Sequence, residues 1–224
     1  MGINRVAFAG ALAALTVTLA ACGGTQQPGG GAAAPAEPMS PTTSAAAAGT
    51  GVTTDEDVFG PACSQLPQGD APGSLDSMGP QPVAGAASTN PLLTTLVTAV
   101  GKVDGLADTL NSQQAITVFA PYNGAFDEVR SAMGDRAFND LLADRTELGG
   151  LLSYHVVPQR YDSDGLVAAG TVTALAGGQI RISGTADAPT ITDGKGNTAS
   201  VLCGNIPTSN ATVFVIDKVL MPAG

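Results

Sequence analysis

TVFAPYNGAF, at residues 117–126, is the stretch of the sequence that decides the fold. Together with the preceding residue its first half is β-prone and alternates between two faces, with Ile116, Val118 and Ala120 on one face and Thr117 and Phe119 on the other. Pro121 is expected to end the strand, because proline has no N–H for a central ladder. Asn123 is expected to cap a helix that returns Phe126 to the core. The stretch therefore predicts a strand that leads directly into a helix, with a role that is mainly scaffolding.

Helix signals dominate on both sides of this stretch, and strand signals dominate the last third of the chain. Asn90 and Pro91 are a cap and a first helical residue, and apolar residues then recur at helical spacing until Gly101. Further short helices are predicted at residues 104–110, 136–142 and 147–152. After His155, β-prone runs follow at residues 172–175, 179–183, 190–192, 199–202 and 212–219. This order predicts an α+β domain rather than a βαβ series.

Residues 1–21 have the pattern of an export signal. After a positive start, residues 6–21 form an uncharged, mostly apolar run of 16 residues, whereas a bilayer span needs roughly 20. The run ends in Leu19-Ala20-Ala21-Cys22, which resembles the lipobox of bacterial lipoproteins. That resemblance implies cleavage before Cys22 and a diacylglyceryl group on its sulfur. The alternative is an ordinary secretory signal in which Cys22 has no special role.

Residues 22–59 are predicted to be a disordered, lipid-anchored linker. Between residues 23 and 54, 27 of the 32 residues are Gly, Ala, Pro, Ser or Thr. Such a segment buries too little apolar surface to offset its ordering entropy, and its ends would lie about 30 Å apart as a flexible coil. Thr42, Thr43 and Ser44 follow a proline and have the composition of an O-glycosylated stalk. A plain, unmodified spacer stays open as the alternative.

The chain has three cysteines, an odd number that needs an explanation in an exported protein. If Cys22 is acylated, Cys63 and Cys203 are left to pair in an oxidising compartment. The disulfide would close a loop of about 140 residues and fasten the region around Cys63 to the last quarter of the chain. The folded domain is therefore expected to span residues 60–224. Two separate buried thiols are the alternative.

Charge and motif counts exclude several classes of protein. Nine basic and nineteen acidic residues give a net charge of −10, and no basic run marks a nucleic-acid binder. The single histidine excludes sites that need two, such as HExxH zinc proteases, and we expect no metal and no cofactor.

The GxGxxA pattern at residues 194–199 lies between two β-prone runs and predicts a turn. A loop starting at Asp162 has Thr173 in place of the calcium-binding Glu, and therefore predicts a solvated turn.

Three stretches, in this order, resemble the fasciclin domain family. They are TVFAPYNGAF at residues 117–126, with Tyr122 where the family usually has Thr, then YHVV at residues 154–157, and NATVFVIDKVLMP at residues 210–222. The resemblance covers about residues 60–222. It implies a compact β-sandwich or wedge with helices packed around it. With the lipobox-like cysteine and the linker, the whole chain resembles the mycobacterial immunogenic fasciclin lipoproteins of the cell surface.

The resemblance implies a role in binding rather than in catalysis. It places the domain on the outer face of the cell membrane, where it would mediate adhesion to protein or glycan partners of the host or envelope. Shedding of the domain stays open, and the lipid itself is expected to be read by innate immune receptors. Tyr154 and His155 are the candidate interaction residues, since this region is associated with receptor adhesion in eukaryotic members. The alternative is that Tyr154 is a core aromatic and His155 spends both nitrogens on internal hydrogen bonds.

Two other functions stay open on the sequence. Many aliphatic and few aromatic side chains suggest a carrier that binds a small apolar or lipidic ligand in a cleft between helices and sheet. The second of these functions is that of a hydrolase. It would depend on His155 as its base, although the chain has no GxSxG elbow and Ser153 lies only two residues away.

Overall fold

The computed structural model describes residues 51–223 of the 224-residue chain. The predicted signal peptide, Cys22 and the stalk residues Thr42, Thr43 and Ser44 lie outside the described residues. The helices of the described part are η1 (Asp55–Asp57), η2 (Cys63–Gln65), α1 (Leu75–Met78), α2 (Val83–Thr89), η3 (Pro91–Leu93), α3 (Thr94–Lys102), α4 (Leu106–Ser112), α5 (Asn123–Met133), α6 (Asp135–Ala143), α7 (Arg145–Tyr154) and α8 (Ser163–Ala169). The strands are β1 (Ile116–Pro121), β2 (Val156–Val157), β3 (Thr171–Thr173), β4 (Gln179–Thr185), β5 (Ala188–Thr192), β6 (Thr198–Pro207) and β7 (Ala211–Ile216).

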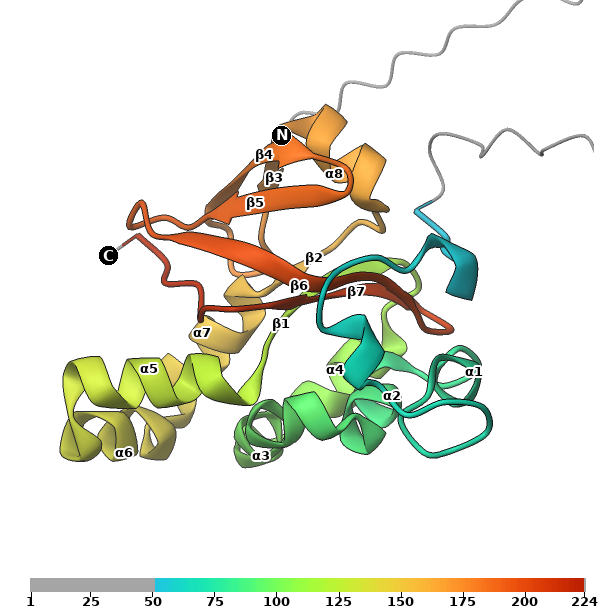
Figure 1. The fold of residues 1–224 in the computed structure, drawn as a ribbon. Coiled ribbons are helices and arrows are strands. Elements are labelled where there is room, and N and C mark those ends of the chain that lie inside the picture. The colour runs from blue at the N-terminus through green and yellow to red at the C-terminus, as the bar shows by residue number, and fades with distance from the viewer. Residues whose placement is uncertain (1–50, 224) are drawn as a thin grey trace, which may run out of the picture. The chain divides into compact units, whose positions relative to one another are not determined.

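The strands form one seven-stranded sheet in the order β2-β1-β7-β6-β5-β4-β3. The pair β1 and β7 is parallel, with Ile116 opposite Ala211, and the other described pairs are antiparallel. The long strand β6 pairs with β5 through its first residues and with β7 through its last. Register shifts along β6 allow it to bend between these partners. The sheet therefore folds over on itself. Helices α1–α7 lie on the side of β1 and β7, whereas α8 packs beside β3 and β4 (Figure 1).

Strand β1 separates two hydrophobic clusters. Ile116, Val118 and Ala120 belong to the cluster shared with helices α1–α7, which we call the helix-side cluster. Phe119 belongs to the cluster enclosed by the folded sheet, which we call the inner cluster, and its ring centroid lies 6.0 Å from that of Phe214 on β7. The predicted division of this strand between two faces is confirmed. Helices on one face and a folded sheet behind it give the α+β sandwich or wedge that the sequence predicts.

The start of helix α5 differs from the prediction. Pro121 occupies the last paired position of β1, opposite Ile216, where a missing N–H costs least. Tyr122 is the N-cap residue of α5, without a side-chain hydrogen bond. The Asn123 carboxamide instead accepts from the Thr95 N–H at 3.0 Å, so it caps the neighbouring helix α3. The prediction that Asn123 caps its own helix was wrong, because its side chain satisfies a donor that lies nearby in space rather than in sequence.

Three α-helices were not predicted: α1, α2 and α8. Asp162 is the N-cap residue of α8, and its carboxylate accepts from the Gly165 N–H at 2.7 Å. The residue is therefore a helix cap, and the prediction of a solvated turn there was wrong. The second predicted turn is present, because Asp193 accepts from the Lys195 and Asn197 N–H groups between β5 and β6.

The N-terminal part of the described chain is fastened to the sheet. Cys63 and Cys203 form a disulfide across a sequence separation of 140 residues. Residues 51–59, which were expected to belong to the linker, also contact the domain. The Gly51 carbonyl accepts from the Arg160 guanidinium at 3.1 Å, and Phe59 forms a β-bridge with Gly204. The folded domain therefore includes residues before the predicted start at residue 60.

Candidate functional site

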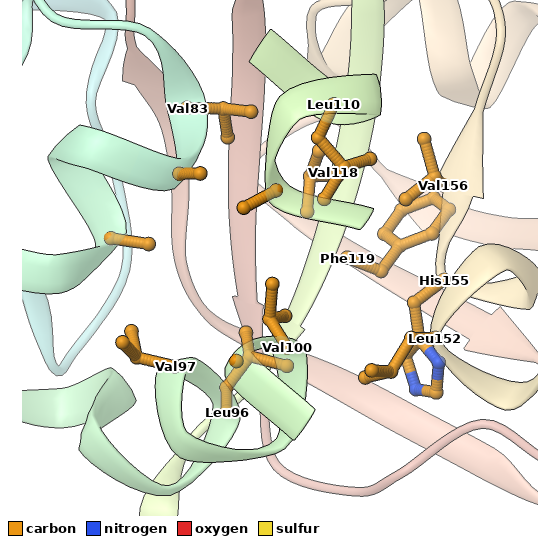
Figure 2. A pocket seen from close by; sticks show the side chains of 14 residues that line it. Val83, Leu96, Val97, Val100, Leu110, Val118, Phe119, Leu152, His155 and Val156 are labelled. Atoms are coloured by element: carbon orange, nitrogen blue, oxygen red, sulfur yellow. The ribbon is translucent and has the colours of Figure 1, made fainter. Parts of the chain in front are cut away.

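A mainly apolar cavity of about 180 Å³ lies between the helices and strand β1 (Figure 2). Helices α2, α3 and α4 supply one wall, and β1 with the segment from Leu152 to Val156 supplies the other. The residues that line it are Val83, Ala84, Ala87, Leu96, Val97, Val100, Gly101, Ala107, Leu110, Val118, Phe119, Leu152, His155 and Val156. Two of the stretches that resemble the fasciclin domain therefore meet at this cavity.

Asn210, the first residue of the third fasciclin-like stretch, holds two of the cavity helices in place. Its carboxamide oxygen accepts from the Val83 N–H at 2.9 Å, at the start of α2. Its amide nitrogen donates to the carbonyls of Leu110 at 2.8 Å and Gln113 at 2.9 Å, at the end of α4. The side chain is buried, so the turn before β7 positions both helices against β1.

His155 forms part of the cavity floor, and both of its ring nitrogens are engaged. The side chain is only 2% exposed. Nε2 lies 2.9 Å from the Leu220 N–H, a group that can only donate, so Nε2 is the acceptor. Nδ1 therefore carries the proton and donates to the Leu151 carbonyl at 2.8 Å. The imidazole links the end of helix α7 to the C-terminal segment in a single tautomer.

Burial sets the charge state of this histidine. It lowers the pKa of the imidazole from 6.5 to about 4, and the Leu151 hydrogen bond and the charge of Asp193 oppose the shift only in part. His155 is therefore neutral at pH 7. The neutral form is also the one that the Leu220 N–H requires, because a protonated Nε2 could not accept from it.

Tyr154 points to the opposite side, into the inner cluster. Its side chain is fully buried, and its hydroxyl donates to the Gln179 carbonyl at 2.7 Å. Burial raises the pKa of this phenol above its ordinary value of 10.0. The ring passes so close to Gly178 that a Cβ atom there would lie 2.5 Å from it. Tyr154 is thus a core aromatic that holds α7 against the start of β4.

Tyr154 and His155, the candidate interaction residues, are buried core residues in this structure. Neither Tyr154 nor His155 presents its side chain to a partner in this structure, because the two side chains point into the two hydrophobic layers on either side of β1 and β2. The same geometry argues against the hypothesis that His155 is the base of a hydrolase. His155 has no free nitrogen with which to take a proton from Ser153 or from any other nucleophile.

The cavity wall offers a ligand almost no polar group. Apart from His155, the lining residues carry only aliphatic or aromatic side chains or, at Gly101, none. Within residues 51–223, no group of three or more His, Cys, Asp or Glu side chains is placed to hold a metal ion. The site can therefore hold an apolar group and has no means of orienting a polar one.

Two of the helices beside the cavity, α2 and α3, are rich in apolar residues. None of the helices in the described part is long and apolar enough to cross a membrane alone. Helix α2 and the η3–α3 segment meet that length and hydropathy condition only as a pair, and the pair is bent by 97°. The sequence analysis suggested a cleft between helices and sheet but did not identify its lining residues, because it did not predict α2. The small residues Ala84, Ala87 and Gly101 were the signal available for it, since small side chains at facing positions leave space.

Comparison with known proteins gives the following relatives. The fasciclin domain family model matches residues 91–222. The chain is 40% identical over 179 residues to the cell surface glycolipoprotein MPB83 of Mycobacterium bovis, which covers 74% of this chain and 73% of that protein. It is 39% identical over 172 residues to the immunogenic protein MPT70 of Mycobacterium tuberculosis, which covers 74% of this chain and 83% of that protein.

A solved structure has the same fold. It is a FAS1 domain pair from the insect cell adhesion molecule fasciclin I, with a TM-score of 0.54 and 17% sequence identity. The match covers 63% of this chain and 51% of that chain, so this chain spans about half the length of the domain pair.

Proposed function

This chain belongs to the fasciclin domain family, and we propose that it is a lipid-anchored surface protein whose fasciclin domain binds partners outside the cell membrane. Cys22 carries the lipid, and the segment from Cys22 to the folded domain is the tether. The partner of the folded domain is a protein or glycan of the host or of the cell envelope. The acyl group is a second, independent ligand, for innate immune receptors.

The observation that carries this proposal is the disulfide in its sequence context. A disulfide persists in oxidising compartments and is rare in the cytosol. The bond between Cys63 and Cys203 accounts for two of the three cysteines, and the third is Cys22 at the end of the export signal. The names of the relatives support the same location: one is a cell surface glycolipoprotein, one an immunogenic protein and one a cell adhesion molecule.

Two finer points belong to the same proposal. We infer O-linked sugars at Thr42, Thr43 and Ser44, because the relative MPB83 is named a glycolipoprotein and this segment has the composition of a glycosylated stalk. Cleavage within the tether would also release the folded domain into the medium. We infer a role in binding rather than in catalysis, and the engaged nitrogens of His155 support it, because the hydrolase hypothesis needs this residue as its base.

Substitution of the acylated cysteine tests the anchor. The full chain and its Cys22→Ala variant are expressed in a bacterium that processes lipoproteins, and membranes are washed with alkaline carbonate. We expect the parent chain in the washed membranes and the variant in the medium, because two acyl chains hold a protein to a bilayer almost permanently. The variant is also expected to lose stimulation of receptor reporter cells.

A matched variant separates the anchor from the stalk. Changing Thr42, Thr43 and Ser44 together to alanine is expected to leave membrane association intact and to remove only the mass of attached sugars. If the Cys22→Ala chain sediments with washed membranes and stimulates reporter cells as well as the parent does, the anchor proposal is wrong.

The second candidate function is a carrier for a small apolar ligand. The cavity of about 180 Å³ between the helices and β1 favours it, because it occupies the place between helices and sheet where such a ligand was expected. This function is compatible with surface display and is tested separately below.

A further inference from the structure

We propose that the cavity between helices α2, α3 and α4 and strand β1 binds the terminal segment of an alkyl chain, with the polar end of that molecule left in solvent. The proposal rests on the second candidate function and names its ligand class and its site. The ligand is recognised by apolar contact alone.

The lining of the cavity selects against polar ligands. His155 is the only lining residue with a polar side chain, and its nitrogens already bond the Leu151 carbonyl and the Leu220 N–H at 2.8 and 2.9 Å. A hydroxyl, amide or charge moved into the cavity would lose its hydration and gain no hydrogen bond there. A methylene or methyl group gains dispersion contacts with these apolar walls. The chemistry of the wall therefore favours a hydrocarbon group over a polar one.

The volume of the cavity limits the length of chain that it can hold. An apolar cavity of about 150 Å³ in another protein stays dry and binds benzene, a ligand of six carbon atoms. By that comparison, a cavity of about 180 Å³ holds about seven carbon atoms. A longer chain can bury only its end, and the remainder must lie along or beyond the mouth.

The mouth provides an apolar route from the surface to the floor. Ala84 and Ala87 on α2, Val97 and Val100 on α3 and Ala107 on α4 are half-buried, whereas Val118 and Leu152 at the floor are buried. No charged side chain lines this path within the described residues. An alkyl chain entering along this path therefore meets apolar side chains throughout, among them the small side chains of Ala84, Ala87 and Ala107.

A chain-length series tests this assignment. The full processed chain carrying Cys22→Ala, which lacks an acyl group of its own, is titrated with straight-chain 1-alkanols from butanol to dodecanol, and the affinity is measured by calorimetry. We expect affinity to rise about fourfold with each methylene, the factor that corresponds to about 0.8 kcal/mol per buried methylene, and to level off near seven carbon atoms. Undetectable binding, or a rise that continues unchanged to dodecanol, overturns the proposal.

Two lining variants and a matched control locate the site. Ala107→Leu narrows the mouth and is expected to weaken 1-heptanol binding by at least tenfold. The same substitution at Ala168, an exposed residue of α8, is expected to leave the affinity unchanged. Val100→Ala enlarges the cavity and is expected to move the plateau to longer chains, a gain that misfolding cannot produce. If Ala107→Leu and Ala168→Leu bind 1-heptanol equally well, the site is not this cavity.

The acylated chain distinguishes two sources of the alkyl group. Weaker alkanol binding by the acylated protein than by the Cys22→Ala chain identifies the lipid on Cys22 as the occupant. Equal binding identifies an external lipid. Failure of the alkanol titration would remove the carrier function and leave surface anchoring untouched, because that proposal is decided by membrane fractionation.

Discussion

Replacing Cys63 and Cys203 together with alanine is expected to lower the free energy of unfolding by about 5 kcal/mol. The disulfide joins residues 140 positions apart, and constraining so long a loop removes much of the conformational entropy of the unfolded chain. Globular domains have total stabilities of about 5–15 kcal/mol, so this loss is a large fraction of the whole. For a domain of this size it corresponds to a fall in melting temperature of roughly 10–20 °C.

Chemical denaturation with and without reductant measures this effect. Reduction is expected to shift the unfolding midpoint of the parent chain to that of the double variant, and to leave the variant itself unchanged. Loss of the bond should also loosen the segment before Cys63, in which Phe59 and Ala62 bond to the backbone of β6. Faster hydrogen exchange at these two amides than at the amides of β1 would report that loosening. A double variant that unfolds at the same denaturant concentration as the oxidised parent would contradict the expected role of the bond.

Replacing His155 with alanine is expected to cost about 3–5 kcal/mol at pH 7. The substitution leaves the Leu151 carbonyl and the Leu220 N–H buried without partners, at about 1–3 kcal/mol for each group, and it also opens a void in the core. His155→Gln, which can keep one of the two bonds, is expected to cost less. Thermal or denaturant unfolding measures both. Unchanged stability of His155→Ala, combined with loss of partner binding, would return the residue to its predicted role at an interface.

The difference in unfolding free energy between the parent chain and His155→Ala, measured as a function of pH, isolates the contribution of the imidazole to stability. Its pKa is about 4 in the folded chain and 6.5 when exposed, so the unfolded chain binds the proton more readily. The contribution of the neutral imidazole is therefore complete above about pH 6.5. It is lost as the pH falls to about 4, by about 3 kcal/mol in total. The stability difference between the parent and His155→Ala should shrink by that amount over this range, while shared carboxylate effects cancel. A difference that is constant between pH 7 and pH 4 would show that the folded-state pKa is not lowered.

Short-range features of the fold were accessible from the sequence. The side-chain period of a strand is two, so five residues were enough to assign Phe119 to one cluster and Val118 to the other. The Asn90 cap was correct, because its side chain accepts from the Leu92 N–H two residues away. By contrast, Asn123 caps helix α3 rather than its own, since its partner Thr95 lies 28 residues away in the sequence.

The residues that line the cavity could not be predicted, because their arrangement depends on long-range contacts. Helix α2 has the sequence VAGAAST, which carries a weak helix signal, and its first N–H is satisfied by Asn210, 127 residues away. Strand β1 pairs in parallel with β7, almost a hundred residues later. Neither contact has a local signature. The exposure of Tyr154 and His155 could not be predicted for a similar reason. A Tyr-His sequence is compatible both with an exposed contact site and with two buried side chains that connect the layers of the domain.

Intact mass spectrometry of the protein extracted from washed membranes tests the central claim most directly, namely that this is an acylated, disulfide-closed domain held at the cell surface. The account predicts a chain that begins at Cys22, carries the added mass of acyl groups, and gains the mass of two hydrogen atoms on reduction. A chain that begins at Met1, carries no acyl mass and is unchanged by reductant would contradict it.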